Sequence, residues 1–303
     1  MTKTYQAETA ANKCNIFKGV LLYGRMIKFS HTVFALPFAL SAAVLALRQN
    51  PITMTDILFI LAAMIGARCA AMGFNRIADS EFDAKNPRTA RRAIPAGKLG
   101  KGHTKLFVLF FSLLFIFSSA MLGSLCLYLS VPVLILLFFY SFTKRFTWIC
   151  HIYLGFSISL APAGTWIALT NSFSWPVLLL SFSLMTYIAG FDILYACLDM
   201  EFDKQEGLFS IPVRFGIKKA LFIASLLHLV SFFFFFLIYI VFDMKLIYLS
   251  SVIIIGLLFI SEHMLVQPDN FTKINTAFFH LNSIISIVLF IGVLADESVS
   301  RWI

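Results

Sequence analysis

Charged residues are scarce in this sequence. Only 13% of its 303 residues are Asp, Glu, Lys or Arg, whereas 60% are hydrophobic. Water could not solvate that much apolar side chain around a folded domain, so the composition excludes an ordinary soluble protein. It predicts an all-α membrane protein with several membrane-spanning helices.

Paired cysteines and a cleavable leader are also lacking. The five cysteines stand singly, without the Cys-x-x-Cys spacing of metal or redox sites, so we interpret them as packing residues. Residues 1–15 are polar and contain no apolar stretch followed by a small-residue cleavage site. We therefore expect no removable signal peptide, and the first span would serve as the targeting signal.

Long apolar runs dominate the rest of the chain. A run of about 20 residues crosses about 30 Å of hydrocarbon at 1.5 Å per residue. The sequence predicts nine spans, near residues 31–49, 54–77, 105–123, 125–142, 149–169, 175–197, 219–241, 245–264 and 275–295. Only Gly123 and Pro132 mark a break between the third and fourth runs, so eight spans remain an alternative. We expect a short N-terminal segment, 1–28, followed by one polytopic domain, 29–303.

The basic residues predict how these spans are oriented. Lys and Arg crowd the N-terminal segment and the second, fourth and sixth loops, whereas the alternate loops hold few. By the positive-inside rule the N terminus and the basic loops are cytoplasmic, and a ninth span would put the C terminus outside. The net charge of +9 is then a topology signal, and we expect no nucleic-acid partner. We expect an integral protein of a bacterial cytoplasmic (inner) membrane.

Two of the predicted cytoplasmic loops, about 75–105 and 192–218, open with acidic residues. The first loop has Asn75, Asp79 and Asp83, and the second has Asp192, Tyr195, Asp199 and Asp203. The four-residue spacing pairs Asp79 with Asp83 and Asp199 with Asp203. Residues four apart lie on one face of a helix, so each pair of aspartates would point the same way. The local sequences ADSEFD and LDMEFD also match, 120 residues apart (79 to 199, 83 to 203). This repeat predicts two halves that face one cavity; the alternative is that these are solvated helix-end charges paired with neighbouring Lys or Arg.

The chemistry of these side chains favours a magnesium site. Four carboxylates and an amide oxygen are hard ligands of the kind that Mg²⁺ prefers, and Mg²⁺ usually bridges one or two carboxylates to substrate phosphates. Two such ions could neutralise a diphosphate leaving group. Cations nearby could bind the same group, or could be topology and lipid-headgroup charges. The candidates are Arg25, Lys28, Arg88, Arg91, Arg92, Lys144 and Arg145.

A diphosphate site beneath apolar helices suggests a substrate whose tail belongs in lipid. A polyprenyl diphosphate has this character. Breaking its C–O bond leaves an allylic cation, which an electron-rich aromatic ring could attack in a dry cavity. The expected partners are therefore a polyprenyl diphosphate, an aromatic acceptor and the lipid bilayer.

Several motifs resemble the UbiA superfamily of intramembrane aromatic prenyltransferases. They are the two aspartate motifs, NPRTARRAIPAGK at 86–98, YSFTKRFTW at 140–148 and SIPVRFG at 210–216. The resemblance covers almost the whole chain. RTARRAIPAG is similar to the RT-x-x-R-x-[IL]-P-x-G loop of the superfamily's 4-hydroxybenzoate polyprenyltransferases.

The resemblance implies a bundle of about nine transmembrane helices around a central cavity. It implies Mg²⁺ as the cofactor, held by Asn75, Asp79, Asp83, Asp199 and Asp203, with the four aspartates as catalytic residues. Diphosphate contacts are expected from Arg88, Arg92, Lys144 and Arg145. Candidates to bind the aromatic substrate or the diphosphate are Arg25, Lys28, Arg76, Tyr140 and Tyr195. The implied reaction is transfer of a polyprenyl chain to the 3-position of 4-hydroxybenzoate in quinone biosynthesis.

Two departures from that pattern keep a second acceptor open. Arg76 follows Asn75 where many 4-hydroxybenzoate enzymes have Asp, and the first span reads RMIKFSHTVFALPFAL where those enzymes often have Lys-Pro followed by glycine. The alternative acceptor is 1,4-dihydroxy-6-naphthoate, in the futalosine route to menaquinone.

Two other classes of protein also carry aspartates in a membrane. A CDP-alcohol phosphotransferase opens its motif with D-G-x-x-A-R, which is absent from this sequence. An ion-coupled transporter places its carboxylates near the bilayer midplane on interrupted helices. The four motif aspartates lie instead at predicted helix ends, which favours the prenyltransferase.

Overall fold

Helices form every element that the structure describes. This computed structural model describes residues 19, 21–28, 32, 34–268, 271, 274 and 276–302. Most of the predicted N-terminal segment, and the first residues of the span predicted at 31–49, lie outside the described residues. The predicted all-α fold is confirmed.

Eight of the helices are long and apolar enough to cross a membrane. They are α3 (Met54–Ala78), α5 (Lys101–Leu122), α6 (Ser124–Thr143), α7 (Cys150–Thr170), α8 (Trp175–Ala196), α11 (Ile217–Val241), α12 (Leu246–Leu265) and α13 (Asn282–Trp302). A turn of π-helix, η3 (Thr276–Leu281), leads into α13. These helices correspond to eight of the nine predicted spans.

The remaining predicted span is the shorter helix α2 (Leu36–Ala46). Pro37 stands in its first turn, a position that suits proline because the first N–H groups of a helix have no partner within it. Eleven residues rise only about 16 Å at 1.5 Å per residue, which is less than the hydrocarbon thickness. The helix in the described residues is therefore shorter than the span predicted at 31–49.

Gly123 separates α5 from α6. Its φ of +134° lies outside the range that other residues adopt easily, so the chain turns there, and α6 begins at the next residue. Pro132 lies inside α6 and does not mark the break. The alternative in which the third and fourth runs form one span is wrong.

The helix α13 extends beyond the end predicted at residue 295. Just past that end, the carboxylate of Asp296 accepts hydrogen bonds from the backbone N–H groups of Lys245 (2.8 Å) and Tyr248 (3.0 Å), at the start of α12. Glu297 accepts a hydrogen bond of 2.8 Å from Nε of Arg48, just beyond α2. Because both charges have partners, the helix continues past them.

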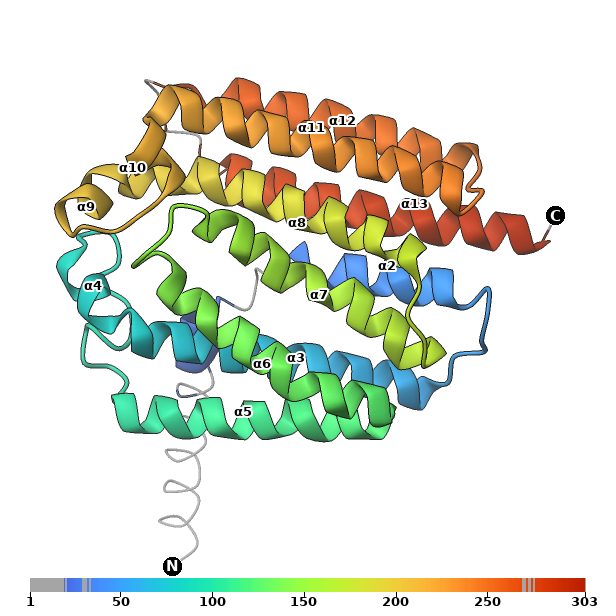
Figure 1. Cartoon of the computed structure of the whole chain (residues 1–303), viewed down its shortest axis with the longest axis horizontal. Helices are drawn as coiled ribbons and strands as arrows, with labels where there is room; N and C mark the ends of the chain where they lie inside the picture. Colours follow the sequence, from blue (N-terminus) through green and yellow to red (C-terminus); the bar gives the residue numbers. More distant parts are fainter. Residues whose placement is uncertain are drawn as a thin grey trace, which may run out of the picture.

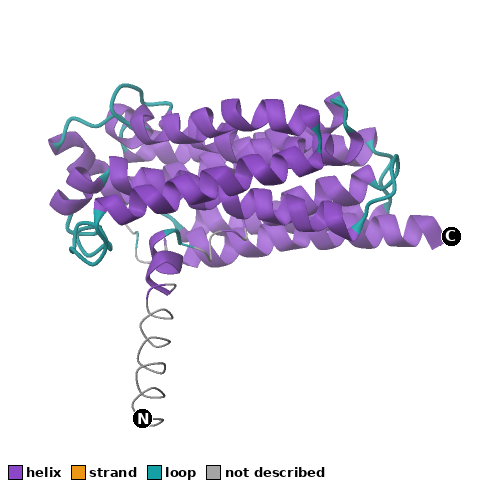
Figure 2. Cartoon of the chain, turned by 90° about the horizontal axis from the view of Figure 1, so that it is seen from below, coloured by secondary structure: helices purple, strands orange, loops and turns teal. Residues whose placement is uncertain are grey.

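The long helices lie side by side, with loops at the two ends of the bundle (Figures 1 and 2). Three short helices gather at one end: α4 (Ser80–Lys85), α9 (Met200–Gln205) and α10 (Ile211–Phe215). The helix α13 ends at the opposite end (Figure 1). In the interior α8 packs against α7 and α11, while α3 packs against α5 and α6. The end that carries α4 and α9 is called the site end below.

Gly155 allows α7 and α8 to approach closely. A Cβ atom at this position would overlap the carbonyl oxygen of Met185 and lie 3.3 Å from the backbone nitrogen of Ala189. Backbone atoms on a packed helix cannot move aside without shifting the helix. This contact therefore sets the distance between the two helices, one turn from His151.

We expect Gly155→Ala to lower the free energy of unfolding by about 1–3 kcal/mol, the usual cost of overpacking. Thermal unfolding of the purified protein in detergent measures this. The matched control is Gly164→Ala on the same helix, where an added Cβ meets nothing within 4 Å. Alanine is the better helix former, so the control should be neutral or slightly stabilising. Equal melting temperatures for the two variants would contradict the close contact.

Candidate active site

Each aspartate motif straddles a break between two helices. Asp79 is both the C-cap residue of α3 and the N-cap residue of α4. Asp199 is the last residue of the short 3₁₀ helix η2 (Cys197–Asp199) and the N-cap residue of α9. Their backbone conformations match, with φ, ψ of −93°, 3° and −101°, 1°. The helix is thus interrupted at the first aspartate of each pair. In the first motif the turn is nevertheless kept, since the N–H of Asp83 donates to the carbonyl of Asp79 at 2.8 Å.

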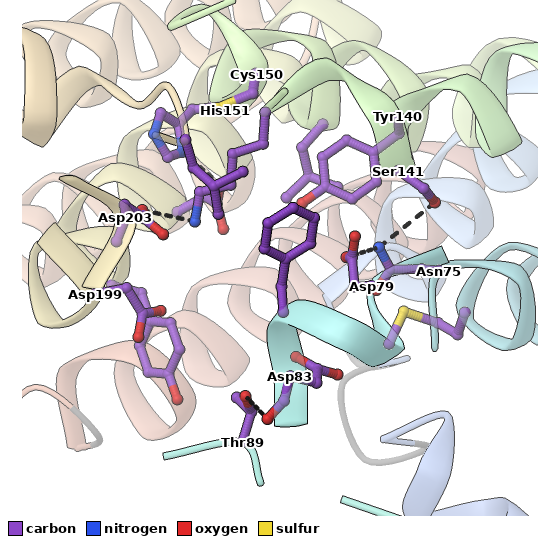
Figure 3. Close-up of a pocket in the computed structure, with 18 of the residues that line it drawn as sticks. Asn75, Asp79, Asp83, Thr89, Tyr140, Ser141, Cys150, His151, Asp199 and Asp203 are labelled. Atoms are coloured by element: carbon purple, nitrogen blue, oxygen red, sulfur yellow. Dashed lines mark hydrogen bonds and ion pairs between the residues drawn. The ribbon is translucent and has the colours of Figure 1, made fainter. Parts of the chain in front are cut away.

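Both motifs line one cavity of about 300 Å³ at the site end. Figure 3 shows Asn75, Asp79 and Asp83 on one side of it and Asp199 and Asp203 on the other. The wall also includes the predicted residues Lys28, Arg76, Arg88, Arg92, Tyr140, Lys144, Arg145 and Tyr195. The structure thus brings together residues from the N-terminal segment, α3, α6, α8 and three loops.

Arg25 and Arg91 are the exceptions among the predicted site residues. Both side chains are exposed, and neither lines the cavity. The helical turns end at Met26, and Lys28 has a left-handed φ of 49°, so the rule that residues three apart share a helix face does not apply here. Lys28 consequently faces the cavity while Arg25 points away.

The carboxylates of the first motif have basic and amide partners. Nη1 of Arg92 lies 2.7 and 2.8 Å from the two carboxylate oxygens of Asp83. Nη2 of Arg145 lies 3.7 Å from Asp79, which also accepts a 2.7 Å hydrogen bond from the amide of Asn75. Burial, and after it the charge of Asp83, raises the pKa of Asp79 above its ordinary value.

The second motif is neutralised by cations from other segments. Arg88, in the loop after α4, forms a two-pronged ion pair with Asp199, and the amide of Asn86 donates to the same carboxylate at 3.1 Å. Nζ of Lys144 lies 2.7 Å from Oδ2 of Asp203, as an ion pair without hydrogen-bond alignment. Burial alone would lower the pKa of Lys144, but the carboxylate of Asp203 raises it.

The alternative of solvated helix-end charges is therefore half right. All four aspartates do pair with Lys or Arg. Asp83 and Asp203 are not solvated, since they are only 6% and 1% exposed, whereas the side chain of Asp79 is 31% exposed. Buried ion pairs are costly to assemble. Paired charges that line a cavity are typical of a binding site.

The deeper wall of the cavity is apolar. It is formed by Phe34, Leu154, Ile158, Ile188 and Phe191, from the segment before α2 and from α7 and α8. One cavity therefore offers charged groups at its mouth and hydrocarbon at its floor, which suits an amphipathic ligand.

The comparison with protein families decides the classification. The model of the UbiA prenyltransferase family matches residues 35–284, which include both aspartate motifs and the loops that pair with them. The chain belongs to the UbiA prenyltransferase family. This membership confirms the resemblance seen in the motifs. The eight apolar helices indicate that this UbiA protein is an integral membrane protein.

Individual relatives agree with this family. The apo structure of a UbiA homolog from Aeropyrum pernix K1 is 30% identical, with a TM-score of 0.80 over 88% of this chain and 98% of that chain. A UbiA homolog from Archaeoglobus fulgidus, solved bound to GPP and Mg²⁺, has a TM-score of 0.66 over 90% and 99% of the two chains. At 16% identity this second likeness concerns the fold alone.

A curated relative is the 4-hydroxybenzoate octaprenyltransferase of Tolumonas auensis. It is 31% identical over 170 residues, which are 56% of this chain and 59% of that protein. The aligned part thus spans less than two thirds of that relative.

The donor set of this UbiA cavity fits Mg²⁺ that binds together with a phosphate ligand. Within the part of the chain that the structure describes, no three His, Cys, Asp or Glu side chains come together as a complete metal site. Mg²⁺ does not require one, because one or two carboxylates, waters and substrate phosphates commonly complete its shell. Each aspartate pair offers such a partial set, and the amide of Asn75 lies beside the first.

Arg68, His151 and Asp192 line the wall although the sequence assigned none of them a role; Asp192 was recognised only as an acidic residue at the start of the second acidic loop. Arg68 lies within α3, well inside the bundle, and its Nε has no hydrogen-bond partner, while Nη2 donates to the carbonyl of Lys28 at 3.1 Å. An arginine inside a 25-residue apolar run was the available signal, since charges there are costly. His151 and Asp192 also line the cavity, 2.7 Å apart. Their separation of 41 residues hid the pair.

Proposed function

We propose that this protein transfers a polyprenyl chain from a polyprenyl diphosphate to an aromatic acid in a Mg²⁺-dependent reaction of quinone biosynthesis. The first candidate acceptor is 4-hydroxybenzoate, prenylated at its 3-position. The observation that carries the proposal is the pair of aspartate motifs facing each other across a cavity with an apolar floor. The name of the curated relative, 4-hydroxybenzoate octaprenyltransferase, supports this reaction. From the loop charges, the site end faces the cytoplasm of a bacterial inner membrane.

The cations around the motifs are proposed to bind the diphosphate. Arginine can hold phosphate oxygens in two-pronged fashion, and lysine acts as a point charge. Arg88, Arg92, Lys144 and Arg145 each hold an aspartate now, so phosphate oxygens and aspartates compete for the same cations. Bound Mg²⁺ would supply the matching positive charge to the aspartates and neutralise the leaving diphosphate.

The apolar floor is proposed to protect the carbon end of the substrate. An allylic cation reacts with water if water reaches it, and a hydrocarbon wall excludes water. The side chains of Phe34, Ile188 and Phe191 lie in this part of the cavity. They would hold the first isoprene units beside the acceptor ring.

A second candidate acceptor is 1,4-dihydroxy-6-naphthoate. The observation that favours it is Arg76, which departs from the usual hydroxybenzoate pattern and is buried in the cavity wall. Both acids carry a carboxylate, and Arg68 and Arg76 are the proposed cations for it. Arg68 has no carboxylate partner among the described residues, so its charge is available to a ligand.

The test incubates the purified protein with Mg²⁺ and a polyprenyl diphosphate, offering the two acids in parallel, and identifies products by mass spectrometry. Prenylated 4-hydroxybenzoate is the expected result. Product from the naphthoate alone would keep the reaction and change the acceptor. No magnesium-dependent product from either acid would contradict the proposal, and ion-coupled uptake into proteoliposomes would then favour a transporter.

The affinity for the diphosphate should fall above about pH 8. Burial, and after it the charges of Arg76, Arg92, Arg88 and Arg68, lowers the pKa of Lys28 to about 8. Lys28 thus loses its proton as the pH rises through that value, and with it the attraction for phosphate. The charge of the ligand stays constant there, because the second ionisation of a phosphate lies near about pH 6.

We expect the KM for the diphosphate to rise about tenfold between about pH 7 and pH 9.5. A change of this size corresponds to the free energy of one charged hydrogen bond. Steady-state kinetics across this range measures the change. In Lys28→Met the KM should be higher at pH 7 and should no longer change with pH. A wild-type KM independent of pH would contradict a role for Lys28 in binding.

A further inference from the structure

One carboxylate of the cavity differs from the others in its partner. The four motif aspartates each pair with Lys or Arg, whereas Asp192 pairs with His151. Asp192 lies on α8, seven residues before Asp199 and therefore about two helical turns, or roughly 10 Å, closer to the apolar floor. Its side chain is 23% exposed, toward the cavity that it lines.

His151 is held so that it orients this carboxylate. Its Nε2 accepts a hydrogen bond of 3.4 Å from the backbone N–H of Ile211, the first residue of α10. Because Nε2 is an acceptor, the ring proton sits on Nδ1, which lies 2.7 Å from Oδ2 of Asp192. The histidine is 3% exposed and lies on the same side of the cavity as Asp203 (Figure 3). It is clamped between α8 and α10 and holds one oxygen of Asp192 in place.

The proposed reaction needs a base at this depth. When the bond between the prenyl carbon and the diphosphate oxygen breaks, the diphosphate leaves with the electron pair. The acceptor ring then forms a C–C bond to the prenyl carbon, and the ring carbon that made this bond must lose its proton to restore aromaticity. The four motif aspartates pair with Lys or Arg, and bound Mg²⁺ would take the place of these partners; either positive charge weakens them as bases.

We propose that Asp192 is the catalytic base that takes this proton, and that His151 is the residue that positions it. This inference rests on the function proposed above. The proton passes from the ring carbon to the free oxygen of Asp192, and the neutral carboxyl group returns it to solvent after the product leaves. Tyr195, three residues further along α8, lines the same wall toward the diphosphate end. The carboxylate of Asp192 therefore lies where the ring of the acceptor is expected, and not where the diphosphate leaving group is expected.

The experiment uses the full-length protein with Mg²⁺, geranyl diphosphate as probe and whichever acid the wild type prenylates. The acid is supplied unlabelled and deuterated at the ring carbons next to the hydroxyl group. For Asp192→Asn we expect kcat to fall about 10²–10⁴-fold, the usual contribution of a general base. The isotope effect on kcat should rise from near one to above about two, because proton removal becomes rate-limiting. The KM for geranyl diphosphate should stay within about twofold.

Matched variants separate positioning from folding. His151→Gln keeps both a donor for Asp192 and an acceptor for Ile211, and should retain kcat within about threefold, whereas His151→Leu loses both and should lose about tenfold or more. Asp243→Asn is the control, since Asp243 is exposed and pairs with Lys245 at the opposite end of the bundle. It should behave as wild type.

The outcomes distinguish this inference from the function beneath it. Wild-type product together with an Asp192→Asn variant that keeps its kcat would overturn the role of Asp192 alone. A lower kcat with an unchanged isotope effect would also overturn it, because the slow step would then be ionisation or binding. Equal losses in His151→Gln and His151→Leu would overturn the positioning role. A wild type without product would overturn the proposed function and this inference with it.

Discussion

Replacing Asp79 or Asp199 with Asn should lower kcat about a thousandfold while the protein stays folded. The substitution keeps the size of the side chain and one oxygen that can accept from Asn75, or from Asn86 and Arg88, but removes the negative charge that a Mg²⁺–diphosphate complex would need. The loss of a metal contact in the transition state is worth several kcal/mol, and about 4 kcal/mol corresponds to a thousandfold.

Product formation at saturating substrate measures this loss, and thermal unfolding checks the fold. Asp243→Asn is again the matched control, because that side chain is 88% exposed and far from the cavity. Retention of more than a tenth of the wild-type kcat by either variant would contradict the metal-binding role.

Replacing Lys144 with Met should destabilise the fold as well as the reaction. Asp203 is 1% exposed, and Lys144 is its ion-pair partner at 2.7 Å. Removing one member of a buried ion pair leaves an uncompensated charge, which typically costs about 3–5 kcal/mol. We therefore expect a clearly lower melting temperature for Lys144→Met, together with loss of turnover.

The double variant Lys144→Met/Asp203→Asn tests the cause of that destabilisation. It removes both charges, so the melting temperature should return close to that of the wild type, while turnover stays lost. Thermal unfolding of the two single variants and the double variant gives the coupling energy between the residues. If the two single effects simply add, the ion pair does not stabilise this part of the fold.

Most of the fold could be predicted from the sequence because lipid imposes simple rules. Eight helices lie within a few residues of the predicted apolar runs, since a helix that crosses a membrane must be long and apolar. Two elements differ from the predicted runs. Helix α2 covers only Leu36–Ala46 of the first run, and the partners of Asp296 and Glu297 allow α13 to continue past residue 295.

The candidate site was predictable where its residues share a motif and not where they meet only in space. The four-residue spacing identified both aspartate pairs. The breaks at Asp79 and Asp199, the outward direction of Arg25 and the pairing of His151 with Asp192 depend on backbone turns and on contacts between distant segments. A single sequence does not contain the distances that decide them.

The order in which the ion-pair partners leave the ribosome has a consequence for membrane insertion. Arg88 precedes its partner Asp199 by 111 residues, and Lys85 precedes its partner Glu206 by 121. Until α8 has been synthesised, these basic groups are unpaired and available to hold their loop on one side of the membrane. Only then can the second acidic segment neutralise them. The same cations can therefore act first as orientation signals for the nascent chain and later as parts of the finished cavity.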